Sequence, residues 1–169
     1  LNFFQSAYTK HHSTESTLLA VHDHLIKAMG QQKVTALCLL DLSAAFDTID
    51  HTILIHRLSS WFGLNGTVLS WLESYLSSRN FFVNIEGSQS ASIPLPPGVP
   101  QGSVLGPLLF ILYTTSLSSL ISNSSVEHHL YADDTQLFIS FTALKFSQTI
   151  SHLETTIDLV STWMSANLL

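Results

Sequence analysis

Three short stretches of the sequence place polar residues directly beside apolar runs. Asp41 follows the apolar run Val34–Leu40, Gly98–Pro107 is rich in glycine and proline, and Tyr131–Asp134 reads Tyr-Ala-Asp-Asp between two alternating segments. A carboxylate at the end of a buried strand is costly unless it is paired or bound to a metal. If the strand before Asp41 pairs beside the hairpin, three carboxylates converge. Such a cluster suits Mg²⁺, which prefers oxygen ligands and usually shares them with substrate phosphates.

Each stretch also has an ordinary structural explanation. An Asp-Asp pair between strands is commonly turn chemistry. Asp41 alone could end a strand or cap the following turn, and a loop rich in proline and glycine indicates little by itself. The three together, in this order and each at the edge of an apolar element, favour a site.

The upstream half of the chain predicts the first elements that would hold these residues. Residues 1–12 are expected to form a loop. Ser13 or Thr14 can cap a helix that runs to about Ala28 and ends at Gly30. The length and β-branched start of Val34–Leu40 predict a strand buried on both faces.

The remaining elements follow from apolar spacing. We expect two helices around residues 54–62 and 68–76, a strand at Phe81–Ile85 with a turn at Gly87-Ser88, a mostly buried helix from Leu108 to about Ile121, a hairpin of Glu127–Tyr131 and Thr135–Phe141, and an amphipathic helix from Phe146 to Met164.

Composition excludes several classes of protein. The chain has 169 residues, of which 46% are hydrophobic and 11% charged, so it is not disordered. The net charge of -6 argues against a basic nucleic-acid-binding module, and the one cysteine excludes an internal disulfide scaffold. The chain begins without Met and ends inside an apolar-periodic segment, so we expect a piece of a longer protein. No signal peptide is visible.

Two further patterns need an interpretation. No residue from Gly87 to Val126 is charged, but the most apolar window, Leu105–Ile121, is shorter than the ~20 residues that a membrane span needs. We therefore expect a buried core helix and no membrane partner. The nine histidines have no accompanying cysteine cluster, and surface or partly packed roles are favoured over a zinc site.

Four motifs together resemble a known family. Asp41–His51 is similar to the first palm motif of the reverse transcriptase domain of non-LTR (LINE-type) retrotransposons, Gly98–Phe110 to the second and Tyr131–Asp134 to the third. Gln5–Tyr8, with His12–Glu15, is similar to the fingers motif upstream. The resemblance covers nearly the whole chain.

The resemblance implies an α+β fold with a polymerase palm, meaning an antiparallel sheet with helices on one face. It adds part of the fingers and is truncated before the thumb. Residues 1–33 would be a fingers segment, and 34–169 the palm with inserted fingers helices. The implied activity is RNA-directed DNA synthesis. Asp41 and Asp133 would hold two Mg²⁺ ions, with Mn²⁺ as a possible substitute, and Asp134 would assist.

The same resemblance assigns roles around the substrates, which would be an RNA template, a DNA primer and deoxynucleoside triphosphates. Phe46 matches the steric gate against a ribose 2′-hydroxyl. The backbone of Leu42 would face the phosphates. The implied site also includes Gln101 and Gly102 at the nucleotide and Tyr131 and Pro100 at the primer and template.

The chain departs from the family in its fingers stretch. Thr9 stands where the family usually has an arginine, which would hold phosphate with two prongs. Lys10 would replace it as a point charge. The palm motif with the family's lysine, the thumb and the endonuclease of the same polyprotein are expected outside these residues. We therefore expect the isolated fragment to be inactive or very weak. The family acts at nuclear DNA after synthesis in the cytoplasm.

Two other functions remain open from the sequence. The first is a catalytically dead retrotransposon remnant that acts at most as a structural or RNA-binding piece. The second is a different two-metal phosphoryl-transfer enzyme such as a nuclease, which needs the carboxylates but neither the Gln101 loop nor the Phe46 gate.

Overall fold

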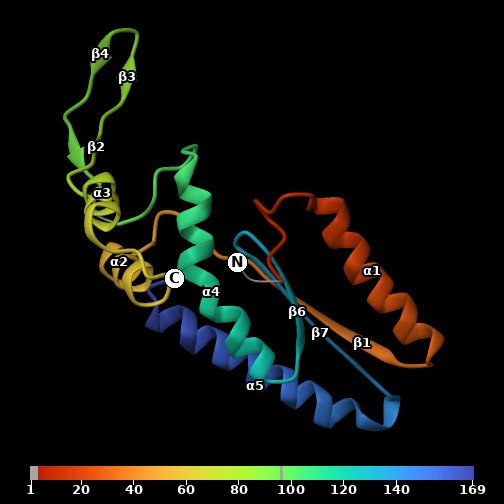
Figure 1. The fold of residues 1–169 in the computed structure, drawn as a ribbon. Coiled ribbons are helices and arrows are strands. Elements are labelled where there is room, and N and C mark those ends of the chain that lie inside the picture. The colour runs from red at the N-terminus through yellow and green to blue at the C-terminus, as the bar shows by residue number, and fades with distance from the viewer. Residues whose placement is uncertain (1–3, 96) are drawn as a thin grey trace. The chain divides into compact units, whose positions relative to one another are not determined.

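The computed structural model describes residues 4–95 and 97–169 (Figure 1). The chain divides into two compact units, and each is described by itself. Unit 1 comprises Leu1–Ala45 and Thr114–Leu169, and unit 2 comprises Phe46–Tyr113. Residues 4–33 thus belong to the same unit as the predicted palm strands.

The sheet of unit 1 contains the predicted strand and hairpin side by side. Strands β1 (Val34–Leu40), β6 (Glu127–Tyr131) and β7 (Asp134–Phe141) form an antiparallel sheet in the order β1-β7-β6. Leu40 pairs with Thr135 at one end of the β1–β7 ladder. The strand before Asp41 therefore lies next to the hairpin, which is the condition under which the three carboxylates are expected to converge.

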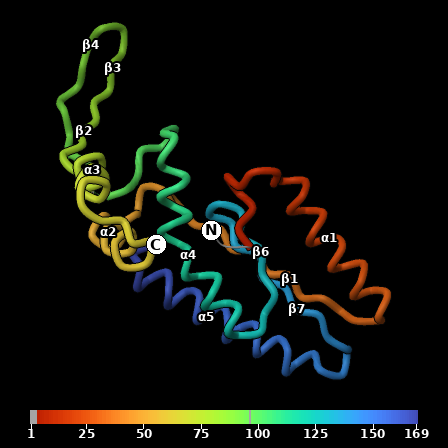
Figure 2. The backbone as a smooth tube through the Cα atoms, viewed as in Figure 1, coloured from red at the N-terminus to blue at the C-terminus, as the bar shows by residue number. Residues whose placement is uncertain are grey.

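The upstream segment, expected to be a loop, adds a short strand-like piece to this sheet. Gln5 forms a parallel bridge with Leu130 of β6. The Ser6 amide donates to the Leu130 carbonyl at 3.0 Å, and the Leu130 amide donates to the Phe4 carbonyl at 2.8 Å. Figure 2 shows the beginning of the described chain beside β6. The loop expectation is therefore wrong at these positions.

The expectation that the first strand is buried on both faces is also wrong. β1 is an edge strand of the sheet, and alternate residues differ in exposure. Leu39 is 69% exposed, and Val34 and Leu37 are exposed as well. Apolar composition alone could not reveal this, since an edge strand and a central strand can carry the same residues.

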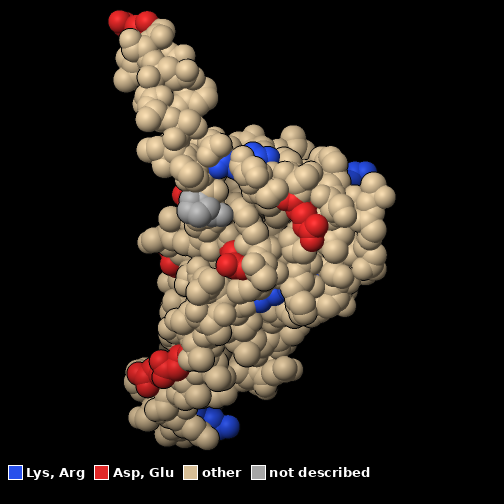
Figure 3. Space-filling model, turned by 90° about the vertical axis from the view of Figure 1, so that its left-hand side faces the viewer, with Lys and Arg blue, Asp and Glu red and all other residues tan. Residues whose placement is uncertain are grey.

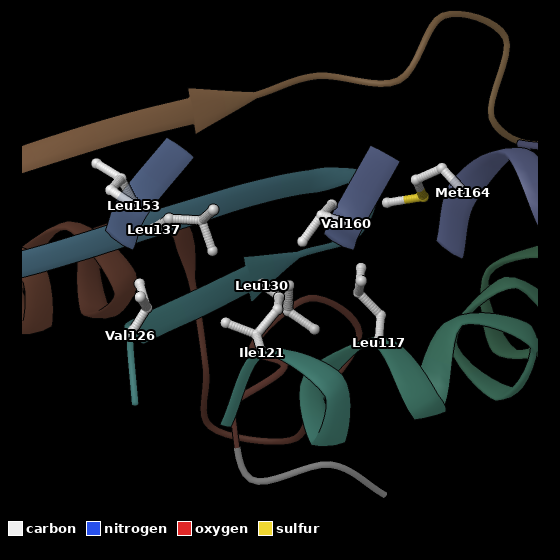
Figure 4. Packing of buried hydrophobic residues seen from close by; sticks show 8 residues of the cluster. All are labelled: Leu117, Ile121, Val126, Leu130, Leu137, Leu153, Val160 and Met164. Atoms are coloured by element: carbon white, nitrogen blue, oxygen red, sulfur yellow. The ribbon is translucent and has the colours of Figure 1, made fainter. Parts of the chain in front are cut away.

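Helices α4 (Leu105–Asn123) and α5 (Phe146–Ala166) cover one face of the sheet. Their buried side chains meet those of β6 and β7 in one apolar cluster (Figure 4). Each such side chain contributes on the order of 1.5–3 kcal/mol when fully buried. The eight residues of the cluster are Leu117, Ile121, Val126, Leu130, Leu137, Leu153, Val160 and Met164.

Helix α1 (Thr14–Gly30) packs on the opposite face. Its His24 contacts Ser140 at 2.8 Å, the ring of Phe138 and, at 3.2 Å, the carboxylate of Glu127. In β7, Phe138 and Ser140 alternate with Leu137 of the apolar cluster, so they face the other way. The expectation of helices on one face therefore holds for α4 and α5 but is wrong for α1, because its polar face finds partners on the second side.

Unit 2 contains α2 (His51–Ser60), α3 (Gly66–Leu76) and a long hairpin. Leu54, Leu58, Leu72 and Leu76 are buried, as the apolar spacing predicted, whereas Trp61 and Val68 of the same apolar spacing are exposed. The strand predicted at Phe81–Ile85 is interrupted, because Phe82 and Val83 are not paired in a strand. Two short strand pairs form in its place. The pairs are β2 (Asn80–Phe81) with β5 (Ile93–Pro94), and β3 (Asn84–Ile85) with β4 (Ser88–Gln89).

Helix α4 begins before the predicted start and contributes buried residues to both units. Within unit 2 it supplies Phe110 and Tyr113, and within unit 1 it supplies Leu117 and Ile121. By length and composition α4 is apolar enough to span a membrane, and half of its most apolar window is buried in the protein. This burial fits the core helix expected from the sequence.

Gly98 allows two loops of unit 2 to touch. Its φ is +94°, and a Cβ there would lie 2.9 Å from backbone atoms of Phe46 and Asp47. Its amide donates to the Ile49 carbonyl at 2.8 Å, and its carbonyl accepts from His51 Nε2 at 2.7 Å. Only glycine permits both this conformation and this approach.

We expect Gly98→Ala to lower the free energy of unfolding by about 2–4 kcal/mol, from backbone strain of about 1 kcal/mol and forced backbone displacement of about 1–3 kcal/mol. Gly63→Ala is the matched control, because Gly63 also has a positive φ (+67°) but open space around its Cβ position. The control should lose only about 1 kcal/mol. Urea denaturation measures both, and equal losses would contradict the close approach.

Candidate active site

The predicted carboxylates gather at one end of the sheet of unit 1. Asp41 directly follows Leu40, whose partner is Thr135, so the register places Asp41 across from Asp134. On the other side of β7, Asp134 pairs with Tyr131. Directly opposed residues of antiparallel strands share a face. The first and third motifs therefore meet in one row across the sheet.

The electrostatics of Asp134 reflect this meeting. Its pKa is raised above the usual carboxyl value by partial burial first, then by the negative charge of Asp133 and then by that of Asp41. Like charges close together disfavour ionisation of one another. The three carboxylates of two motifs that are far apart in sequence thus act on each other in the folded chain.

Asp133 lies in the two-residue turn that joins β6 to β7. The other turn residue, Ala132, has a φ of +54°, and Asp133 is not among the residues with positive φ. A positive φ at the first central residue alone is the pattern of a type II′ turn. This tight turn places Asp133 directly beside Asp134 at the end of the sheet.

The donor set fits Mg²⁺ shared with a substrate. Asp41 and Asp134 are exposed and Asp133 is half-buried, so their oxygens are accessible. Within residues 4–95 and 97–169, no three His, Cys, Asp or Glu side chains form a ready-made metal cage. Mg²⁺ commonly uses one or two carboxylates, with waters and phosphates completing its shell. The predicted ligands have the chemistry for that arrangement.

The face that carries these carboxylates is open near them. Leu39, two residues before Asp41 in β1, is exposed, whereas His24 of α1 covers Phe138 and Ser140 toward the other end of the strands. The end of the sheet with the acidic row is therefore accessible to a large ligand.

The other predicted residues of unit 1 lie in different surroundings. Leu42 packs its side chain against the apolar cluster. Lys10 is exposed in a turn after Thr9, whose hydroxyl donates to the Gln5 carbonyl at 3.2 Å. The structure thus assigns the Leu42 side chain to packing, which leaves its backbone for the predicted role.

The predicted residues of unit 2 are connected to one another through the first and second motifs. The ring of Phe46 stacks on that of Phe110, with centroids 4.8 Å apart. The Gln101 side-chain amide donates to both carboxylate oxygens of Asp47 at 3.1 Å. Pro100 accepts from the Ser103 hydroxyl at 2.7 Å.

Gly102 follows this pair with a φ of +76° and open space where a Cβ would be. Its backbone conformation favours glycine, and the open space beside its Cα leaves room for a ligand to approach the backbone. This agrees with the close approach expected at a nucleotide, which remains a prediction.

Sequence reasoning missed three residues that hold these loops. Gly98 brings the second motif against the first, and Asp47 is the partner of Gln101. Gln5 is buried and bonds to the turn at Ala132. Each of the three lies inside one of the motifs that resemble the family. The type of a residue alone, however, does not show which distant residue it contacts.

Comparison with known proteins identifies the chain's relatives. The family model of reverse transcriptase (RNA-dependent DNA polymerase) matches residues 1–169. The RNA-directed DNA polymerase from mobile element jockey of Drosophila melanogaster is 30% identical over 137 residues, which are 78% of this chain and 15% of that protein. The probable RNA-directed DNA polymerase from transposon BS of the same species is 33% identical over 113 residues, 67% of this chain and 12% of that protein.

A solved structure supports the fold. The structure of apo telomerase from Candida tropicalis, truncated from its C-terminal domain, matches with a TM-score of 0.66 and 17% identity, over 92% of this chain and 32% of that one. The chain spans about 15% of the length of the jockey polymerase. Together, the motifs, the α+β fold and the match over all its residues show that the chain belongs to the reverse transcriptase family and is related to the reverse transcriptases of non-LTR retrotransposons.

Proposed function

We propose that this chain is the catalytic part of an RNA-directed DNA polymerase that adds deoxynucleotides to a primer 3′-hydroxyl on an RNA template. The observation that carries this function is the row of carboxylates at the open end of the sheet, where Asp41 lies across from Asp134 and Asp133 lies in the adjoining turn. Residues 1–33 would form a fingers segment, and residues 34–169 would form the palm with inserted fingers helices.

Asp41 and Asp133 would hold two Mg²⁺ ions, and Asp134 would assist by adding negative charge. When bound, the ions supply a lower pKa at the primer hydroxyl and neutralise the charge that develops on the triphosphate. Mn²⁺ would serve as a substitute. The chain itself orients the carboxylates through the β1–β7 register.

The substrates are an RNA template, a DNA primer and deoxynucleoside triphosphates. The backbone of Leu42 and the side chain of Lys10 would contact the triphosphate, Gln101 and Gly102 the base pair that forms, and Tyr131 and Pro100 the primer and template. Lys and Arg side chains are few and separated on the face shown in Figure 3. Because phosphate neutralisation supplies much of duplex affinity, other segments of a longer polymerase would provide most of it.

Phe46 would act as the gate that rejects ribonucleotides. Its ring is half-buried and stacks on that of Phe110 at an interplanar angle of 28°, so its position is fixed by a contact with a second aromatic ring. A fixed ring discriminates by steric exclusion because it cannot turn away from a 2′-hydroxyl.

A catalytically dead remnant is the second candidate. The observation that favours it is Thr9, which takes the place of the family's arginine and directs its hydroxyl to the carbonyls of Gln5 and Ala7. That hydroxyl is engaged with the chain's own backbone. Binding of the triphosphate would then depend on the charge of Lys10.

We expect Asp133→Asn to reduce primer extension on an RNA template with Mg²⁺ by at least about 100-fold, since charge stabilisation at the reacting phosphate is lost. The assay uses the chain together with the adjoining sequence of its own reading frame. Asp158→Asn, at an exposed position of α5, is the control and should retain activity. Extension that survives in Asp133→Asn would refute the proposed function, and an inactive unsubstituted chain would favour the remnant.

A second prediction concerns the carboxylate repulsion. Because the pKa of Asp134 is raised in the folded chain, the folded state holds its proton to higher pH than the unfolded state, and stability falls as pH rises through that window. Asp134→Asn should therefore raise Tm at pH about 8 without metal, and the gain should vanish at pH about 3, below the ordinary carboxyl pKa.

The same melting experiment includes Mg²⁺. The ion should raise the Tm of the unsubstituted chain more than that of Asp134→Asn, because it relieves a repulsion that the variant lacks. Asp158→Asn again serves as the control. A lower Tm for Asp134→Asn at pH about 8 without metal would contradict carboxylate repulsion.

A third prediction tests the gate. Phe46→Val should decrease the preference for deoxynucleotides over ribonucleotides at least about tenfold, measured as the ratio of kcat/KM values, since a smaller side chain admits the 2′-hydroxyl. Phe110→Leu keeps the Phe46 ring but removes the ring contact that fixes it, so it should shift this ratio in the same direction but by less than Phe46→Val does. If the two variants shift the ratio equally, Phe46 acts only through packing.

A further inference from the structure

The turn that carries Asp133 is held from outside its own hairpin. Gln5 Oε1 accepts a hydrogen bond from the Ala132 amide at 3.1 Å, and Gln5 Nε2 donates to the Ala132 carbonyl at 3.4 Å. Both backbone groups of one turn residue are thus bonded to one side-chain amide. Gln5 is 3% exposed, so water does not compete for these bonds.

The amide of Gln5 is itself fixed in orientation. Its Oε1 also accepts a hydrogen bond from the Ala7 amide at 3.0 Å. If the side-chain amide were flipped by 180°, its NH₂ group would face the amides of Ala7 and Ala132, which are themselves donors, and both bonds would be lost. Its backbone is seated beside β6 by the bonds that Phe4 and Ser6 make to Leu130. We call the two hydrogen bonds from the Gln5 side chain to Ala132 the clamp. The residues around Gln5 orient the clamp, so its geometry does not depend on the turn alone.

A second set of contacts locks the same segment to β6. The Ser6 hydroxyl lies 2.9 Å from His129 Nε2 and 2.8 Å from His12 Nδ1. Ser6 is buried, and the partial burial of His129 itself lowers the pKa of that ring, with a smaller lowering by His12. The segment from Phe4 to Ser6 thus behaves as part of the sheet.

The turn needs such support for two reasons. Ala132 adopts a positive φ, which strains a residue with a side chain. The carboxylates of Asp133 and Asp134 directly follow it in the chain, and the repulsion between their like charges favours any conformation that separates them. A neutral amide holds the turn without adding another charge to the cluster.

We propose that Gln5 is a positioning residue that fixes the Tyr131–Asp134 turn, so that Asp133 and Asp134 stay in register with Asp41 for metal binding. The inference rests on the proposed function for its metal step. The clamp itself is measurable without any catalytic assay.

The test compares Gln5→Leu with the control Thr17→Val. Thr17 is equally buried and donates to the Ser13 carbonyl at 3.1 Å, so its loss weakens the same part of the chain without touching the turn. Amide hydrogen exchange at Ala132 and Asp133 reports on the turn, and calorimetric titration with Mg²⁺ reports on the site.

In Gln5→Leu we expect exchange at Ala132 to accelerate about tenfold or more and the Mg²⁺ dissociation constant to rise about tenfold, as for other residues that orient metal ligands. Thr17→Val should leave both unchanged. Unaltered exchange at Ala132 in Gln5→Leu, or equal acceleration in Thr17→Val, would overturn the proposal.

Gln5→Glu provides a conservative rescue. A buried carboxyl resists ionisation, and its protonated form offers one donor and one acceptor as the amide does. Protection of Ala132 should match the unsubstituted chain at low pH and disappear as pH rises. The unsubstituted chain measured at each pH accounts for the neighbouring titratable groups His12, His129, Asp133 and Asp134. Protection that does not depend on pH in this variant would contradict the clamp.

The two proposals fail separately. If Asp133→Asn leaves Mg²⁺ binding unchanged while Gln5→Leu still frees the Ala132 amide, the metal function is wrong and the clamp stands. If Asp133→Asn abolishes Mg²⁺ binding while Gln5→Leu changes neither measurement, the metal function stands and the clamp is wrong.

Discussion

The antiparallel register between β1 and β7 is the constraint on which the candidate site depends. Side chains alternate between faces with every residue of a strand, so a slip by one position would send Asp41 to the face covered by α4 and α5. The apolar residues of β1 prevent that slip, because Cys38 and Leu40 would leave the core at the same time. The apolar packing on one face of the sheet therefore determines that Asp41 lies on the other face.

Periodic patterns in the sequence predicted much of this fold. The helices α1 and α5 and the hairpin of β6 and β7 follow from the spacing of residues that are close together in the chain. The pairing of β1 with this hairpin joins distant segments, and the sequence indicates it only as the condition for the carboxylates to converge. The cost of an isolated carboxylate after a buried strand is the signal that favours this convergence.

Other features could not be predicted because they depend on distant partners. The exposure of Leu39 follows from the position of β1 at the sheet edge, and the role of Gly98 follows from a backbone segment about fifty residues earlier. Gln5 is polar and lies in a stretch without periodicity, which is typical of a loop. Nothing in its neighbours indicates that its amide reaches Ala132.

The bridge between Gln5 and Leu130 has a consequence for how the chain folds during its synthesis. The partners are separated by nearly the whole length of the sheet-forming sequence, and the side-chain bonds from Gln5 to Ala132 join residues 127 positions apart. At ribosomal speeds of about 5–20 residues per second, the first segment waits several seconds or longer for its partner. Contacts of such long range close slowly as well, since the intervening chain loses entropy. The acidic turn therefore reaches its final geometry late, after local helices such as α1 have had time to form.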